Sequence, residues 1–109
     1  MPGRLMLESS VRRAVLDYAK VRYHALTRKL SIQGAMGNAG WPDDMILGEK
    51  AMAGTATIPV IFFIEFKRPG NKLTPLQEAT KKEIEGRGFH YYIVFTIESG
   101  KKVIDEELG

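Results

Sequence analysis

Apolar residues recur at helical spacing over the first part of the chain. They fall at Val11, Ala14, Val15, Tyr18, Val21 and Ala25, while the polar faces carry Arg12, Arg13, Lys20 and Arg28. This period predicts one amphipathic helix over residues 5–28. Residues 99–108 predict a short helix at the other end of the chain.

Two continuous apolar runs predict buried strands. Residues 58–67 hold isoleucine, valine and phenylalanine on both alternating faces, which is typical of a central strand covered on both sides. Residues 91–96 predict another buried strand. Residues 30–33 and 44–47 predict two short strands, joined by the glycine-rich turn of residues 34–42, and residues 48–54 predict a loop.

Between the two buried strands, the sequence carries the signals of a helix start. Pro75 suits the first helical position, and Thr74 and Gln77 have the spacing of a capping box. Gly86 and Gly88 end this helix. The predicted order is α-β-β-β-α-β-α, an α/β fold in which a mixed central sheet is flanked by helices.

Composition limits the class of protein. A chain of 109 residues predicts a single domain, residues 1–109, and 44% apolar with 27% charged residues is ordinary for a globular protein. No apolar run reaches the roughly 20 residues that span a membrane, and the N-terminus has no secretory signal, so we expect a cytoplasmic, non-secreted protein. With no cysteine, disulfides and thiolate metal sites are excluded. The net charge of +3 mildly favours binding to polyanions.

Polar residues at the end of the strongest predicted strand are the first candidates for chemistry. Glu65 and Lys67 are two residues apart, so they leave the same face of the sheet, on which Ile61 and Phe63 are expected to be core. Asp43 precedes another predicted strand and meets Glu65 if the two strands are neighbours. Hard carboxylate oxygens suit Mg²⁺ or Mn²⁺. Glu8 shares the apolar stripe of the first helix and is a candidate third acid.

These motifs together resemble a known family. Pro42-Asp43, a gap of 21 residues and Glu65-Phe66-Lys67 resemble the PD-(D/E)xK nuclease signature. The match is closer to the VRR-NUC (virus-type replication-repair nuclease) domain in its standalone form. Its Val-Arg-Arg motif corresponds to Val11-Arg12-Arg13, its Gly-x-Pro-Asp motif to Gly40-Trp41-Pro42-Asp43, and its glutamine-bearing helix to the segment that begins at Thr74.

The resemblance implies a restriction-endonuclease-like fold and a set of site residues. Asp43 and Glu65 would ligate Mg²⁺, with Mn²⁺ as a substitute, and the Phe66 carbonyl would add a ligand. Lys67 would be catalytic. Glu8 matches the acid of the first helix, which reaches the metal directly or through water, and Gln77 matches a glutamine that organises the site.

The resemblance also implies what the protein acts on. Standalone members of this family act as homodimers on branched DNA such as four-way (Holliday) junctions, which points to phage biology or DNA repair. Basic residues are candidates for the DNA track, namely Arg12, Arg13, Arg68, Lys72 and Lys81. The alternatives are an inactive nucleic-acid-binding module, a restriction-type endonuclease and an RNA-directed nuclease.

Each candidate also has a structural interpretation. Glu65 and Lys67 would be a surface pair at a strand end, and Asp43 a turn residue after Pro42. Glu8 would be a solvated acid that favours the helix dipole. Gln77 would only cap Thr74, and we give the two roles of Gln77 equal weight.

For Arg12 and Arg13, taken individually, a solvated helix face is slightly favoured over phosphate contact. Trp41 could stack on a base, but we favour a role in bracing the loop. The sequence does not decide the preferred DNA structure, the cut position or the number of metal ions.

Overall fold

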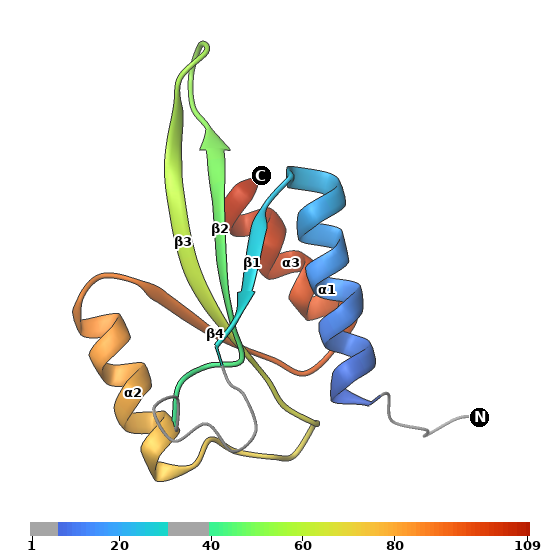
Figure 1. Cartoon of the computed structure of the whole chain (residues 1–109), viewed down its shortest axis with the longest axis vertical. Helices are drawn as coiled ribbons and strands as arrows, with labels where there is room; N and C mark the ends of the chain where they lie inside the picture. Colours follow the sequence, from blue (N-terminus) through green and yellow to red (C-terminus); the bar gives the residue numbers. More distant parts are fainter. Residues whose placement is uncertain (1–6, 31–39) are drawn as a thin grey trace.

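A computed structural model describes residues 7–30 and 40–109, and it has the predicted order of elements (Figure 1). In chain order these are α1 (Glu8–Tyr23), β1 (Leu26–Lys29), β2 (Asp44–Ala51), β3 (Thr57–Phe66), α2 (Pro75–Gly86), β4 (His90–Val94) and α3 (Ile97–Leu108). The predicted α-β-β-β-α-β-α succession is therefore confirmed.

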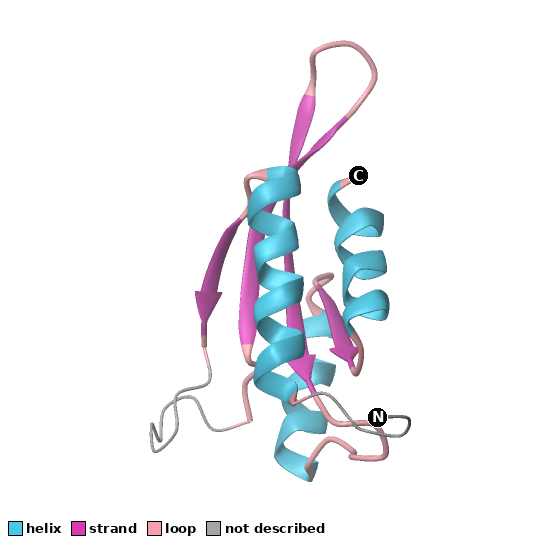
Figure 2. Cartoon of the chain, turned by 90° about the vertical axis from the view of Figure 1, so that its right-hand side faces the viewer, coloured by secondary structure: helices cyan, strands magenta, loops and turns pink. Residues whose placement is uncertain are grey.

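The four strands form one mixed sheet in the order β1-β2-β3-β4. β1, β2 and β3 pair antiparallel, whereas β3 and β4 are parallel, and α2 makes the crossover between them. α1 and α3 lie together on one face of the sheet, and α2 lies on the other (Figure 1; Figure 2). This arrangement is the predicted mixed sheet flanked by helices.

β3 divides its side chains between two cores. Phe62, Ile64 and Phe66 face α1 and α3 in the main core, while Phe63 packs with Ile84 and Tyr91 beneath α2. Burial on both faces explains the continuous apolar run in the sequence. The prediction that Ile61 is core is wrong: it is 39% exposed, because the cluster beneath α2 does not extend to it.

The first helix is shorter than predicted. α1 ends at Tyr23, and residues 26–29 form β1 instead of a last helical turn. His24 adopts the left-handed conformation (φ 56°) and donates its backbone N–H to the Lys20 carbonyl, and the Ala25 N–H reaches the Ala19 carbonyl. This is a Schellman end without the glycine that usually signals it. Leu30 follows β1 directly, and the rest of the strand predicted at 30–33 lies outside the described residues.

The second strand is longer than predicted. β2 continues through Gly48 to Ala51, where the sequence suggested a loop, and only residues 52–56 form the turn to β3. Gly48 lies close beneath α3, where a Cβ would come within 2.7 Å of the end of the Leu108 side chain. As a result, the β2–β3 hairpin projects beyond the helices (Figure 1).

The last two helices have capping boxes. Thr74 and Gln77 form the predicted one at the start of α2, and Thr96 and Ser99 form a second that starts α3 two residues earlier than expected. α3 crosses α1 closely at Gly100, where a Cβ would lie 2.3 Å from Val15. Within the described residues, no helix is long and apolar enough to cross a membrane.

Candidate active site

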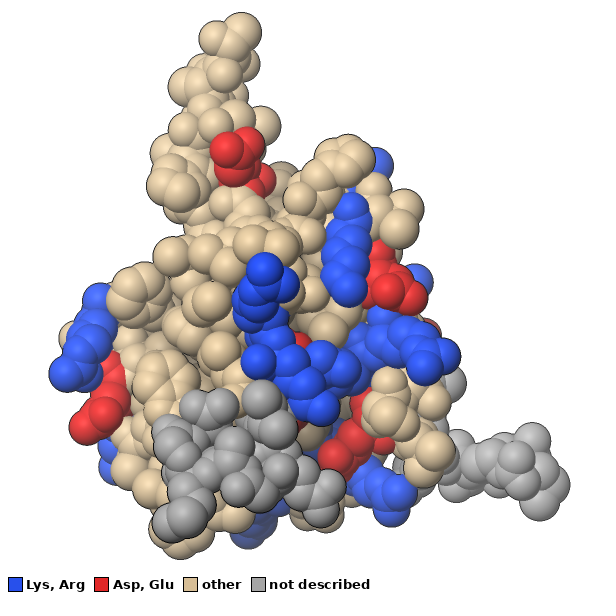
Figure 3. Space-filling view, viewed as in Figure 1, with Lys and Arg blue, Asp and Glu red and all other residues tan. Residues whose placement is uncertain are grey.

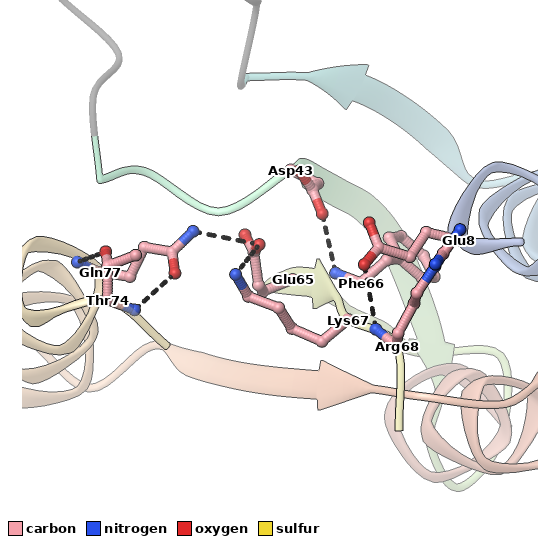
Figure 4. A network of polar contacts seen from close by, with 8 residues as sticks. All are labelled: Glu8, Asp43, Glu65, Phe66, Lys67, Arg68, Thr74 and Gln77. Carbon is pink, nitrogen blue, oxygen red and sulfur yellow. Dashed lines mark hydrogen bonds and ion pairs between the residues drawn. The ribbon is translucent and has the colours of Figure 1, made fainter. Parts of the chain in front are cut away.

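Backbone pairing places three of the predicted site residues at one end of the sheet. Asp43 immediately precedes β2, and its carbonyl accepts the Leu30 N–H at 2.8 Å. Its carboxylate accepts the Phe66 N–H of β3 at 2.8 Å. Lys67 is held on the other side by its N–H, which donates to the Val94 carbonyl at 3.0 Å. β2 and β3 are neighbouring strands, which was the condition for Asp43 to meet Glu65. Their pairing brings Asp43 next to the strand end that carries Glu65 and Lys67 (Figure 4).

Glu65 is the most buried acid of this group, with 4% of its surface exposed. One carboxylate oxygen, Oε2, accepts a hydrogen bond from Gln77 Nε2 at 3.2 Å and lies 3.7 Å from Lys67 Nζ. The other, Oε1, is buried and has no hydrogen-bond partner among residues 7–30 and 40–109. A buried carboxylate oxygen without a donor is costly, so this atom calls for a positively charged or hydrogen-bonding ligand.

The electrostatics of the site indicate uncompensated negative charge. Burial, and then the charge of Asp43, raise the pKa of Glu65 to about 7, although Lys67 acts in the opposite direction. Burial also raises the pKa of Asp43, and the Phe66 N–H only partly offsets it. A cation bound between these two desolvated carboxylates would favour their charged forms.

Glu8 joins this network from α1. Its Oε1 accepts the backbone N–H of Arg68 at 3.0 Å, just beyond the end of β3 (Figure 4). Its charge also contributes to raising the pKa of both Asp43 and Glu65. Glu8 is therefore placed at the edge of the site, as its position on the helical stripe predicted.

Gln77 makes both of the contacts that the sequence left open. Its backbone N–H donates to Thr74 Oγ1 at 3.2 Å, and its Oε1 accepts the Thr74 N–H at 2.9 Å, which completes the capping box. The remaining amide nitrogen then points to Glu65 (Figure 4). The helix cap fixes the side chain that touches the buried acid.

The donor set can accept a divalent cation only with help from the backbone or water. Among residues 7–30 and 40–109, no group of three or more histidine, aspartate or glutamate side chains is arranged to hold a metal ion. Asp43 and Glu65 therefore supply two carboxylates, and Glu8 does not complete a three-acid cage. Hard cations such as Mg²⁺ commonly bind through one or two carboxylates and keep several waters, so the residues fit such an ion.

The residues predicted to contact DNA differ in exposure and in whether they already pair with an acid. Arg12 binds Asp44 through two hydrogen bonds of 2.7 and 2.8 Å, and Asp44 is fully buried. Lys81 pairs with Glu85 at 2.9 Å and lies over the Tyr91 ring. Arg13, Arg68 and Lys72 are exposed. Lysine and arginine side chains gather over α1 and β1 on the face seen in Figure 3.

Asp44 is the residue that the sequence analysis missed. It alternates with Ile46 along β2, so its side chain faces the main core, where Arg12 pairs with it at 2.7 Å. The spacing of two residues between Asp44 and Ile46 on a predicted strand was the signal that could have placed Asp44 on the buried face. Arg12 is thus the partner of a buried acid, and the solvated helix face that the sequence slightly favoured for it is wrong.

Comparisons with known proteins agree with this architecture. No protein-family model matches the sequence, and no curated protein matches it. A solved structure described as a VRR_NUC domain superposes with a TM-score of 0.69, covering 90% of this chain and 94% of that chain at 24% sequence identity. At that identity the likeness establishes the fold. The chain accordingly has the fold of a VRR_NUC domain, as the resemblance predicted.

Proposed function

We propose that this protein is a metal-dependent nuclease that hydrolyses phosphodiester bonds in DNA at the site of Asp43, Glu65 and Lys67. The observation that carries the proposal is the buried Oε1 of Glu65, which has no hydrogen-bond partner in the part of the chain that the structure describes, on a strand end that Asp43 adjoins. The VRR_NUC fold supports a nuclease, and the net charge of +3 is compatible with a polyanionic substrate.

Each residue has a distinct task in this proposal. Asp43 and Glu65 would hold Mg²⁺, or Mn²⁺ in its place, together with the Phe66 carbonyl. The bound ion would neutralise a phosphate oxygen and lower the pKa of a water molecule. Lys67, whose ammonium lies 3.7 Å from Glu65, would orient the attacking water and offset the negative charge that develops on the phosphate. Gln77 would keep Glu65 in place.

Substitution of Lys67 tests the assignment directly. We expect Lys67→Ala to lower the cleavage rate by at least about 100-fold, because a preorganised charge at the transition state is lost. Asp43→Ala should abolish metal-dependent cleavage. The assay is cleavage of labelled DNA with Mg²⁺ or Mn²⁺, and the matched control is Lys102→Ala, an exposed lysine on α3. Full activity of Lys67→Ala would refute the proposed site.

The preferred substrate is proposed to be branched DNA, including four-way junctions, on the basis of the family resemblance. A panel of single strands, duplexes, flaps, splayed arms and four-way junctions tests this choice. Preferential cleavage of unbranched duplex would exclude it and leave the nuclease assignment in place. An RNA strand in the panel tests the RNA-directed alternative.

We also propose that the protein works as a homodimer through the β2–β3 hairpin. Residues 51–58 carry no charge, all of them are exposed, and they include Met52 at 47% and Ile58 at 43% exposure. An uncharged, apolar projection is unusual on a monomer surface and suits a self-complementary two-fold contact. Two active sites held in this way could cut two strands of one junction.

A binding module without catalysis is the second candidate. It is favoured by one observation, namely that the described residues contain no group of three metal-binding side chains. Calorimetric titration with Mg²⁺ and Mn²⁺ separates the two functions. A nuclease requires metal binding that Asp43→Ala removes, whereas intact DNA affinity with no metal binding supports the binding module.

A further inference from the structure

A hollow of about 320 Å³ lies on the face of the sheet that α2 covers, where it is lined by residues of β3 and α2 together with Trp41 and Phe89. Phe63 and Ile84 are buried in it, at 8% and 6% exposure, whereas Trp41 and Phe89 are 42% and 41% exposed. Three polar residues complete its lining, namely Thr80, Glu83 and Arg87. The hollow therefore offers aromatic rings to solvent together with a small number of polar groups.

Its position relative to the site follows from the strands. Phe63 lies two residues before Glu65 on the same face of β3, and Trp41 lies two residues before Asp43. The segment that carries Trp41 is pressed against α2, because a Cβ on Gly40 would lie 2.5 Å from Leu76 Cγ, and Gly40 has a positive φ of 82°. The hollow and the carboxylates are thus built on the same two segments.

Two aromatic rings of the hollow, Trp41 and Phe89, pack against Phe63 without parallel stacking. Trp41 and Phe89 each meet Phe63 edge-on, with ring centroids 6.4 and 6.3 Å away and interplanar angles of 62° and 87°. This packing braces Trp41, as the sequence analysis favoured. The contacts with Phe63 also hold the two exposed rings in place, which reduces the entropy cost of stacking a planar ligand on them.

We propose that this hollow binds one unstacked nucleobase of the strand that is cut, next to the scissile phosphate. The inference rests on the proposed nuclease function for the position of the cut. A base brings a planar face for Trp41 and Phe89 and an edge with both donors and acceptors. Arg87 donates one nitrogen, Nη1, to the Glu83 carbonyl and keeps further N–H groups for the acceptors, and the Glu83 carboxylate can accept from the donors. A phosphate would offer only acceptors and be repelled by Glu83.

A pocket for an unstacked base implies a preference among DNA substrates. A base can enter it only after leaving the stack, which is least costly in single strands, at flaps and at branch points. The protein should therefore cut where a base next to the phosphate is unpaired, and should cut an intact duplex poorly. Base stacking on aromatic side chains is largely independent of sequence, so the preference is for structure.

The single tryptophan of the chain gives a direct test. Trp41 emission is recorded while a short single-stranded oligodeoxynucleotide, and then its duplex, is added to the Lys67→Ala protein with Mg²⁺ present. We expect saturable quenching by the single strand and weak quenching by the duplex. Inorganic tripolyphosphate is the charge control, and quenching by it equal to that by the oligonucleotide would overturn the proposal.

A matched pair of variants locates the effect. Phe89→Leu keeps an apolar side chain but removes a ring, and it should weaken single-strand binding by about tenfold. Phe95→Leu alters an aromatic residue that is 36% exposed outside the hollow and should leave binding unchanged. Thermal unfolding of both variants checks that they fold. Equal binding by both variants would overturn the base pocket.

Cleavage assays separate this inference from the proposed function. If the wild-type protein cuts no DNA, yet quenching depends on Phe89, the pocket stands and the nuclease assignment fails. If the protein cuts DNA, a single abasic site moved along the strand should slow cleavage at one position next to the cut. Cleavage that is indifferent to every abasic position and to Phe89→Leu would refute the pocket and leave the nuclease assignment intact.

Discussion

Gln77 joins a helix cap to a buried acid through one side chain. Thr74→Ala removes the bond from the Gln77 N–H to Thr74 Oγ1 but leaves the Gln77 side chain in place. Gln77→Ala instead removes the bond from the Thr74 N–H to Gln77 Oε1 and, with it, the contact to Glu65. We predict that each variant lowers the free energy of unfolding by about 1 kcal/mol, measured by urea denaturation. Only Gln77→Ala should also reduce the cleavage rate. Equal activity of the two variants would show that Gln77 acts as a cap alone.

Arg12 compensates the charge of a fully buried acid, Asp44. We predict that Arg12→Met destabilises the fold by about 3 kcal/mol, because the carboxylate is left unpaired in the core. Arg13→Met, one residue along and exposed, should change stability by less than about 0.5 kcal/mol. Chemical denaturation of both variants checks this. If the two variants are equally stable, Arg12 is free to contact DNA, the other role that the sequence left open for it.

Elements with strong local signals could be predicted from the sequence, and those set by tertiary packing could not. The β3 run and the Thr74 capping box were correctly placed, because each depends on residues close in the chain. The end of α1 was wrong because a histidine adopts the left-handed turn, and Val21, assigned to the buried stripe, is 79% exposed. The extension of β2 depends on pairing with β3, which no local pattern contains.

One carboxylate of α3 adds polar contacts to the apolar packing between α1 and α3. Asp105 of α3 accepts hydrogen bonds from the hydroxyls of Tyr23 and Tyr18 of α1, at 2.5 and 2.7 Å, and these bonds lower its pKa. A lowered pKa stabilises the fold above the ordinary value of 3.8, and the contribution is lost as the pH falls through the lowered pKa. The helix pair is therefore predicted to weaken in acid.

Asp105→Asn tests this contribution, with Asp17→Asn as an exposed acid on α1 for comparison. We expect Asp105→Asn to lower the free energy of unfolding at about pH 7, and this difference from wild type to shrink at about pH 3. Urea denaturation at the two pH values measures it. A difference that is the same at both values would show that the carboxylate charge has no role.

At the scale of the whole molecule, the site is assembled by strand pairing between distant segments. Glu65 and Lys67 could be placed on one face from strand alternation alone. Asp43 joins them only because β2 pairs with β3, and Glu8 only because α1 packs across the end of the same strand. The family resemblance supplied this grouping before the topology was known. It gave no indication of Asp44 or of the aromatic hollow, whose residues come from segments that no short motif covers.

The projecting hairpin gives the last prediction. Met52→Glu places a charge in the uncharged stretch of residues 51–58, and in a two-fold contact the two copies would bring like charges together. We expect the wild-type protein to sediment as a dimer and Met52→Glu as a folded monomer. Because each monomer keeps a complete site, Met52→Glu should still nick DNA but should lose paired cuts in a four-way junction. Val21→Glu adds the same charge at an exposed aliphatic residue on α1 and should remain dimeric. A monomeric wild-type protein, or dissociation by Val21→Glu alone, would rule out the hairpin as the dimer contact.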